Sequence, residues 1–232
     1  MPKTSQDILG EALVDFYNGE QHPLFINNKY GDPEEMPIEV FFREKEDLTD
    51  LEKTAISKCK GRILDVGAGS GAMTLMLQDH HDTTAVESSE GACQVMKALG
   101  VKNGIIGDVF DYPGEDYDTL LLLMNGIGIV GQLSNLGKAL KYFADMIKPD
   151  GQILLDSSDI SYLYDEVDKP KSAYFGQLSY QYHYKDKLGD WFDWLYVDKV
   201  TLKEHANNAG LLVEILFEDD TDQYLARLTK NK

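Results

Sequence analysis

Apolar positions fall into two spacings along most of this chain, one typical of strands and one typical of helices. In the central region, short apolar runs predict five strands, at 62–66, 83–87, 103–107, 119–124 and 152–156. The stretches between them have helical spacing, with helices beginning at 71 and 89 and a further one marked by Leu136, Leu140, Phe143 and Ile147 that stops at Pro149. Strict alternation of strand and helix predicts a parallel sheet covered by helices on both faces.

The flanking regions follow other patterns. Before the central region we expect a helix over 5–18, a looser stretch over 22–42, and a helix begun by the capping box Thr49 to Glu52. After it, alternation over 175–184 and 191–197 predicts an inserted β-hairpin. A helix over 201–209 and two strands at 211–217 and 223–228 then end the chain, and the short connection makes these two strands antiparallel.

The predicted fold class is therefore α/β, a doubly wound and mostly parallel seven-stranded sheet with an antiparallel C-terminal hairpin and an inserted β-hairpin. We divide the chain into an N-terminal helix and lid segment, 1–47, and a ligand-binding domain, 48–232. Residues 157–197 of that domain are expected to form a cover over the substrate. No internal repeat or low-complexity tract interrupts this organisation.

Composition and net charge limit the kinds of partner that this protein can bind. With 43% hydrophobic and 27% charged residues the composition is that of a globular protein, and no apolar run is long enough to span a bilayer. The net charge of −18 repels phosphate backbones, which argues against nucleic acid and weakly favours a neutral or cationic small molecule. Cys59 and Cys93 form no CxxC pair, so we expect a reducing cytoplasm, no secretory signal and no metal site.

The candidate chemistry lies in the stretch ILDVGAGSG, residues 63–71, between a predicted strand and a predicted helix. Its glycines let the backbone turn sharply and approach a ligand. Asp65 ends the first strand, Glu87 ends the second about 20 positions on, and Asp108 follows the third. Ligands bind at this edge of such sheets, and three carboxylates there oppose a pyrophosphate. They suit a sulfonium, an ammonium, a ribose and an adenine amine, which are the groups of S-adenosylmethionine.

Several motifs resemble those of class I S-adenosylmethionine-dependent methyltransferases. ILDVGAGSG resembles the family's glycine-rich first motif, AVESS around Glu87 its second, and GDVFDY around Asp108 its third. DTLLLLMNGIG and MIKPDGQILLD resemble its fourth and fifth strands, and 201–228 is similar to the hairpin that closes the sheet. The resemblance covers about residues 48 to 156 and indicates the family rather than any substrate.

The resemblance also implies roles for individual residues. Glu87 is expected to bind the ribose hydroxyls, Asp108 to accept from the adenine amine with Val109 beside it, and Asn125 to lie where the methionine end meets the acceptor. The methionine part is expected to be held by Asp65, Gly67, Ala68, Gly69 and Gly71. The segment Asn125 to Gly128 lacks the Asn/Asp-Pro-Pro-aromatic signature of methylases that act on nucleic-acid bases, which counts against base methylation.

Other candidates for the site have competing interpretations. Asp156, Asp159 and His183 are candidates for catalysis, although Asp159 is equally placed to cap a helix. The candidates for substrate binding are Tyr30, Phe42, Arg43 and Tyr174. The many Tyr and Trp residues of the insert fit either a half-buried sheet face or an aromatic cover. We expect the insert, with Tyr30 and residues 41–43, to close over the ends of the fourth and fifth strands.

The predicted function is transfer of a methyl group from S-adenosylmethionine to an oxygen or nitrogen of a small molecule. One alternative is a nicotinamide-dependent oxidoreductase, because Gly67, Gly69 and Ala72 fit the dinucleotide fingerprint, although Asp65 and Asp108 oppose it. A second alternative is a non-catalytic S-adenosylmethionine-binding or interaction protein, since a fold alone does not determine function.

Overall fold

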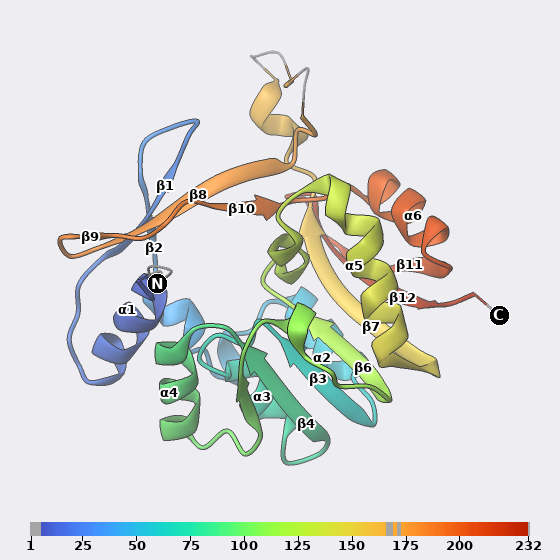
Figure 1. Cartoon of the computed structure of the whole chain (residues 1–232), viewed down its shortest axis with the longest axis horizontal. Coiled ribbons are helices and arrows are strands. Elements are labelled where there is room, and N and C mark those ends of the chain that lie inside the picture. Colours follow the sequence, from blue (N-terminus) through green and yellow to red (C-terminus); the bar gives the residue numbers. More distant parts are fainter. Residues whose placement is uncertain (1–5, 166–168, 171–172, 232) are drawn as a thin grey trace.

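A seven-stranded sheet forms the centre of the molecule (Figure 1). The computed structural model describes residues 6–165, 169–170 and 173–231, so parts of the expected segments 1–47 and 157–197 lie outside the described residues. The strand order is β11-β12-β7-β6-β3-β4-β5. The bounds are β3 (Arg62–Val66), β4 (Asp82–Glu87), β5 (Gly104–Ile106), β6 (Tyr117–Leu122), β7 (Ile147–Ser158), β11 (Leu211–Glu218) and β12 (Gln223–Lys230).

The expected topology is confirmed. The neighbours from β5 to β7 pair in parallel, whereas β12 is antiparallel to both β7 and β11. Because the order reverses between β3 and β6, the carboxyl ends of these two strands border a crevice where open α/β sheets bind their ligands.

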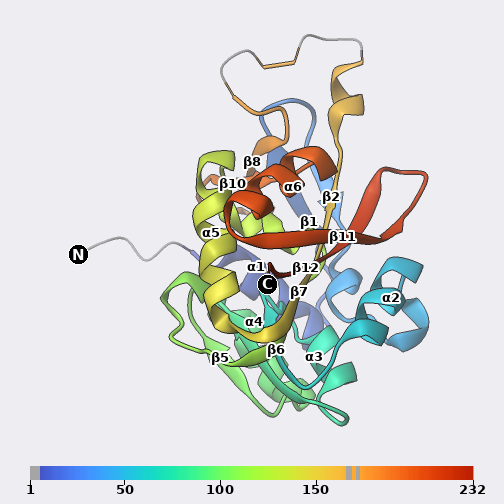
Figure 2. The same ribbon diagram turned by 90° about the vertical axis from the view of Figure 1, so that its right-hand side faces the viewer.

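Helices cover both faces of the sheet. They are α1 (Ile8–Tyr17), α2 (Asp50–Lys58), α3 (Ala72–Leu77), α4 (Glu90–Leu99), α5 (Leu133–Met146) and α6 (Lys199–Asn208). Ile63 and Leu121 share a buried cluster with α2 and α3, whereas Leu64 and Leu120 share one with α5 and α6. In Figure 2, α5 and α2 lie on opposite sides of β7. Alternate residues of the central strands thus point to opposite layers, which explains their continuous apolar runs.

A second, antiparallel sheet joins two distant parts of the chain. Its order is β10-β8-β1-β2, and β9 also pairs with β8. The bounds are β1 (Leu24–Asn28), β2 (Glu34–Met36), β8 (Gln177–Tyr184), β9 (Lys187–Leu188) and β10 (Phe192–Leu195). The inserted hairpin is confirmed, but the stretch 22–42 contains two strands that its pattern did not indicate. In Figure 1 this sheet lies above the carboxyl ends of the large sheet.

Helix α1 fastens the N-terminal segment to α4. An added Cβ at Gly91 would lie within 2.5 Å of the Gly10 backbone, so the two helices are in direct main-chain contact. The Asp7 carboxylate accepts hydrogen bonds from the Gly10 and Gly91 N–H groups, both at 2.9 Å, and from the Ser89 hydroxyl at 2.9 Å. One side chain therefore caps α1 and ties it to the beginning of α4.

Candidate functional site

The glycine-rich loop turns between β3 and α3. Gly67, Gly69 and Gly71 have φ values of 68°, 57° and 87°, which side chains with a Cβ rarely adopt. Gly71 also needs to be glycine for space, because a Cβ there would lie within 3 Å of side-chain atoms of Met96 and Val101. The positive φ values and the close packing at Gly71 thus shape the loop, and its backbone faces the space above the sheet.

Two carboxylates follow the loop along the same edge. Glu87 accepts hydrogen bonds from the N–H groups of Gly69 and Ser89, both at 2.9 Å, and only 9% of it is exposed. Asp108 accepts from the Phe110 N–H at 2.9 Å and so begins the 3₁₀-helix Val109–Asp111. Both side chains border the same cavity as the loop.

Asp65 has a different environment. It is 4% exposed and does not line the cavity, and its carboxylate accepts a hydrogen bond from the Thr74 hydroxyl at 2.6 Å. Burial raises the pKa of this carboxyl to about 6, with a further contribution from the charge of Glu87 and an opposing one from the Thr74 hydrogen bond. Asp65 therefore supports the loop from beneath and joins it to α3.

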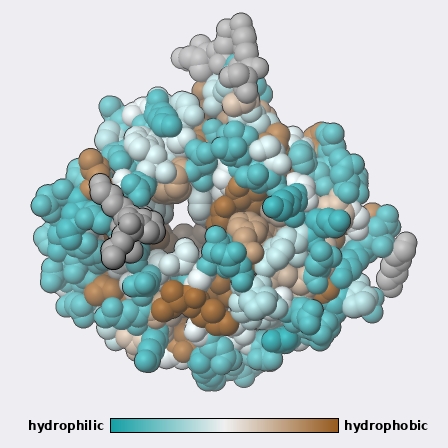
Figure 3. Space-filling model, in the orientation of Figure 1, coloured by the Kyte–Doolittle hydropathy of each residue, from teal (hydrophilic) through white to brown (hydrophobic). Residues whose placement is uncertain are grey.

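A cavity of about 450 Å³ lies between the two sheets. Figure 3 shows a hollow near the centre of this face, with hydrophobic residues beside it. Its floor comes from the loop and the ends of β4, β5 and β6, and its other walls come from the N-terminal segment and the second sheet. The lining residues used below are Leu9, Met36, Phe41, Gly67, Ala68, Gly69, Glu87, Gly107, Asp108, Val109, Phe110, Met124, Tyr182, Phe192, Asp193 and Trp194. The size is in the range of small-molecule sites, roughly 300–1,000 Å³.

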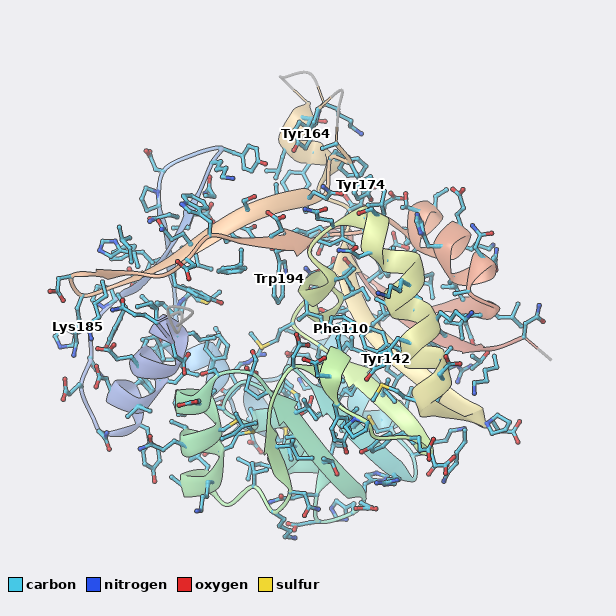
Figure 4. All side chains as sticks on the ribbon, viewed as in Figure 1. Phe110, Tyr142, Tyr164, Tyr174, Lys185 and Trp194 are labelled. Atoms are coloured by element: carbon cyan, nitrogen blue, oxygen red, sulfur yellow. The ribbon has the colours of Figure 1, made fainter. Side chains whose placement is uncertain are left out.

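Aromatic rings from β8 and β10 form the wall opposite the glycine loop. The ring centroids of Tyr182 and Phe192 are 5.1 Å apart, and those of Phe192 and Trp194 are 6.2 Å apart in an edge-to-face arrangement. Figure 4 shows Trp194 pointing from β10 into the space between the sheets, with Phe110 on the side of the large sheet. The indole is braced by Gly128, where an added Cβ would collide with it. The insert thus lies at the same edge of the large sheet as the loop.

The N-terminal segment meets the loop directly. The Ser70 hydroxyl donates a hydrogen bond to the Phe41 carbonyl, and a Cβ at Gly69 would lie 3.1 Å from the Phe41 ring. Leu9 and Met36 line the cavity from α1 and β2. Apart from Phe41, sequence reasoning had not singled out these contacts, because the pairing of the N-terminal strands with β8 brings them there.

Asn125 connects the carboxyl ends of β6 and β7 to the insert. Its N–H donates to Asp156 Oδ1 at 2.8 Å, and its side-chain oxygen accepts from the Ser157 hydroxyl at 2.9 Å. Its amide also donates to the Leu195 carbonyl at 3.3 Å. Met124 and Asn125 have φ values of 60° and 55°, and Met124 rather than Asn125 lines the cavity.

The three catalytic candidates, all within the described residues, lie outside the cavity lining. Asp156 is 1% exposed, and burial raises the pKa of its carboxyl to about 7, opposed by hydrogen bonds from the backbone of Asn125. Asp159 accepts from the Ser161 N–H at 2.9 Å, but the N-cap of the following 3₁₀-helix Ser161–Tyr164 is Ile160, without a side-chain cap. His183 follows Tyr182 directly on β8, so the two side chains point to opposite faces of the strand. The ring centroids of His183 and Phe25 are 6.2 Å apart.

The four substrate-binding candidates, which the structure also describes, do not line the cavity either. Arg43 donates to both carboxylate oxygens of Glu52, which satisfies the guanidinium within the protein. Phe42 stacks against Phe16, and Tyr174 donates to Asp198 at 2.6 Å. Tyr30 is 61% exposed. Each has a structural partner or faces solvent, so the side chains nearest the expected acceptor are instead those of the aromatic wall.

Comparison with known proteins agrees with this geometry. A sequence model of the methyltransferase domain family matches residues 64–155. An S-adenosylmethionine-dependent methyltransferase from Bacteroides fragilis, crystallised with S-adenosyl-L-homocysteine, superposes with a TM-score of 0.90 at 38% identity, over 97% of this chain and 95% of that one. The chain belongs to the class I S-adenosylmethionine-dependent methyltransferases. Its cofactor is S-adenosylmethionine.

More distant members of the methyltransferase family match shorter regions. An uncharacterized methyltransferase of Staphylococcus carnosus is 30% identical over 133 residues, and YcgJ of Bacillus subtilis is 25% identical over 126 residues. These matches cover 47% and 50% of this chain, but only 62% and 48% of the two relatives. In the part of this methyltransferase that the structure describes, no helix is long and apolar enough to cross a membrane.

The lining suits the methyltransferase cofactor. Added Cβ atoms at Gly67 and Gly107 would meet nothing within 4 Å, so the bare backbone borders open space at the loop and at the end of β5. Glu87 and Asp108 supply acceptors for hydroxyl and amine groups, while Val109 and Phe110 add apolar surface beside them. This donor and acceptor set matches a ribose and an adenine without a pyrophosphate.

Proposed function

We propose that this chain transfers the methyl group of S-adenosylmethionine to an oxygen or nitrogen of a small-molecule acceptor. One observation carries the proposal: the glycine loop, the two carboxylates and the aromatic wall of the insert border a single cavity. A cofactor bound on the loop would therefore share one cavity with the acceptor.

In this proposal the cofactor lies along the edge of the large sheet. Gly67, Ala68 and Gly69 approach the methionine part with their backbone, Glu87 accepts from the ribose hydroxyls, and Asp108 accepts from the adenine amine. Gly71 and Asp65 maintain the shape of the loop. Asn125 contributes indirectly, by fixing the backbone beside the cavity, because its side chain is hydrogen-bonded to Ser157 and to the Leu195 carbonyl.

The bound cofactor supplies an electrophilic methyl group on a sulfonium, which is already a good leaving group. The remaining task of the protein is to hold the acceptor in line with that methyl group and to exclude water. The second sheet performs this task in our proposal, since Tyr182, Phe192 and Trp194 form the wall opposite the loop. The expected lid of 157–197 thus consists of β8 and β10, while residues 1–47 contribute Leu9, Met36 and Phe41.

We also propose that the acceptor is a metabolite rather than a nucleic acid, and that the protein works in the cytoplasm. The net charge of −18 and the acidic lining of the cavity both disfavour a polyanion. Cys59 and Cys93 are buried free thiols, which suits a reducing compartment.

Calorimetry with S-adenosylhomocysteine and with NAD tests the cofactor half of the proposal, and a metabolite screen for S-adenosylhomocysteine release tests the transfer half. We expect binding of S-adenosylhomocysteine and a rise in melting temperature, equivalent to roughly 2.7 kcal/mol at 100 times the dissociation constant. Binding of NAD instead would contradict the proposal. Cofactor binding without turnover on any metabolite would favour a non-catalytic binding protein.

A further inference from the structure

The described side chains that line the cavity carry negative charge and no positive charge. Among the described residues that line it, none is Lys, Arg or His, whereas Glu87, Asp108 and Asp193 are all acidic. A carboxylate or phosphate on the acceptor would have no cationic partner here and would be repelled by these three groups. The lining therefore disfavours anionic acceptors and favours neutral or cationic ones.

Among the described residues of the lining, none is suited to removing a proton from a hydroxyl group, because the proposed cofactor site already uses Asp108 for the adenine amine. Hydrogen bonds from Gln132 and Ser179 hold the pKa of the Asp193 carboxyl below its usual value, so Asp193 is a weak base. Glu87 already accepts two backbone hydrogen bonds. Burial raises the pKa of the Tyr182 hydroxyl, which keeps it protonated. An alcohol is too weak an acid to give its proton to water, so it needs a protein base during attack. An ammonium can lose its proton to water and then attack as the neutral amine.

The aromatic wall provides what an amine requires. When an amine nitrogen accepts a methyl group, positive charge develops on that nitrogen, and ring faces attract cations by about 0.5–2 kcal/mol. The Tyr182 hydroxyl has no hydrogen-bond partner among the described residues, although the side chain lines the cavity. The structure thus leaves a free polar group beside the rings of Phe192 and Trp194.

We propose that the acceptor is a small organic amine, held against Tyr182, Phe192 and Trp194 with its apolar body in the cavity. This inference rests on the proposed function and specifies its acceptor. The bound ammonium first loses one proton to water, which frees the lone pair of its nitrogen. That lone pair then forms the new bond to the methyl carbon, and the methyl–sulfur bond breaks with its electrons passing to sulfur. The methylated ammonium then releases a proton to water.

The chain offers a direct spectroscopic test, because Trp191 and Trp194 are its only tryptophans. Trp191 is 45% exposed, outside the cavity lining and next to Lys29, so Trp191→Phe leaves Trp194 as the single reporter of the cavity. The ligands are matched sets that share a benzyl, cyclohexyl or butyl body and carry an amine, an alcohol or a carboxylate. Each is titrated into Trp191→Phe loaded with S-adenosylhomocysteine, and Trp194 emission is recorded.

We expect at least one amine to change this emission and to bind at least tenfold more tightly than its alcohol and its carboxylate. With S-adenosylmethionine, that amine should gain one methyl group by mass spectrometry. A carboxylate or alcohol that binds as well as its amine would overturn the inference, as would the absence of binding by every amine. If S-adenosylhomocysteine itself does not bind, the proposed function fails instead.

Two further variants locate the amine by calorimetry. Tyr182→Phe removes only the free hydroxyl and should weaken the amine severalfold while affinity for S-adenosylhomocysteine is unchanged. The matched control is Tyr184→Phe on the same strand, whose hydroxyl bonds to Asp15 away from the cavity and should not matter to the amine. Trp194→Leu should weaken amine binding at least tenfold. Equal amine affinity in Tyr182→Phe, Trp194→Leu and the control would place the acceptor elsewhere.

Discussion

Glu87 illustrates how one side chain can serve both the fold and a ligand. Its carboxylate accepts from the N–H groups of Gly69 and Ser89, so it couples the loop after β3 to the beginning of α4. The same carboxylate borders the cavity, and its oxygens have further lone pairs for ligand hydroxyl groups. In our proposal, loop shape and ribose binding therefore depend on a single residue.

We expect Glu87→Gln to weaken S-adenosylhomocysteine binding by about 1.5–3 kcal/mol, because hydrogen bonds to a charged acceptor are lost. Calorimetry measures this change, and circular dichroism checks that the variant stays folded. Glu90→Gln, at an exposed position in the first turn of α4, is the matched control and should bind normally. Unchanged affinity in Glu87→Gln would remove Glu87 from the proposed ribose site.

Two buried carboxyl groups should make the folded protein less stable as the pH rises. Burial raises the pKa of Asp156 from 3.8 to about 7 and that of Asp65 from 3.8 to about 6. The folded chain thus holds these protons more tightly than the unfolded chain. Their stabilisation is complete below about pH 4 and is lost as the pH rises through about 6 and 7.

We therefore expect the free energy of unfolding to fall by on the order of a few kcal/mol between about pH 4 and pH 7, at about 1.4 kcal/mol per unit of pKa shift. Urea titrations across this range measure the slope. Asp156→Asn cannot ionise at this position and should make the slope shallower, leaving the part due to Asp65. Asp145→Asn, at an exposed site on α5, should leave the slope unchanged. The same slope in both variants would assign the effect to other groups.

Among the helices and strands, the sequence predicted best those that depend on residues close together in the chain. The strand 62–66 has the predicted bounds, and the capping box at Thr49 forms as expected, with both Thr49 and Glu52 hydrogen-bonded. The strands β1 and β2 could not be predicted because they are short and partly exposed. They depend on long-range pairing, of β1 with β8 and of β2 with β1. Arg43 was a candidate for a ligand carboxylate, but it pairs with the Glu52 carboxylate, a contact that the fold rather than the local pattern creates.

The contact between α1 and α4 gives a prediction at this scale. Gly91→Val places side-chain atoms where the Gly10 backbone lies, so we expect a loss of about 1–3 kcal/mol and faster proteolysis of the N-terminal segment. Gly137→Ala on α5 is the control, because its added methyl would meet His205 at an ordinary 3.6 Å. That variant should gain about 0.5–1 kcal/mol from helix propensity. Equal stability of Gly91→Val and the native chain would show that α1 is not docked on α4.

Across the whole molecule, the net negative charge opposes folding into a compact state. The chain carries 40 acidic and 22 basic residues, and several of its ion pairs, such as Lys102 with Asp79, are exposed. Exposed pairs add little to stability, whereas the excess of like charge repels itself throughout the fold. Added salt should therefore weaken the repulsion among the excess acidic groups more than it weakens the attraction within ion pairs.

We expect the melting temperature to rise when NaCl is increased from low millimolar to about 0.15 M, where the screening length is about 8 Å. Scanning calorimetry measures the shift. An equal ionic strength of choline chloride should reproduce it, because screening does not depend on the identity of the ion. A fall in melting temperature would mean that ion pairs outweigh the net charge.

The pairing of β1 with β8 has a consequence for synthesis of the chain. Leu24 pairs with Tyr184, so the ribosome must add roughly 160 residues before β1 meets its partner. At about 5–20 residues per second, the N-terminal strands wait on the order of ten seconds or more. A nascent chain that has reached α5 already contains the glycine loop and both carboxylates but lacks the aromatic wall. The cofactor half of the cavity is made first, and the last third of the chain encloses it.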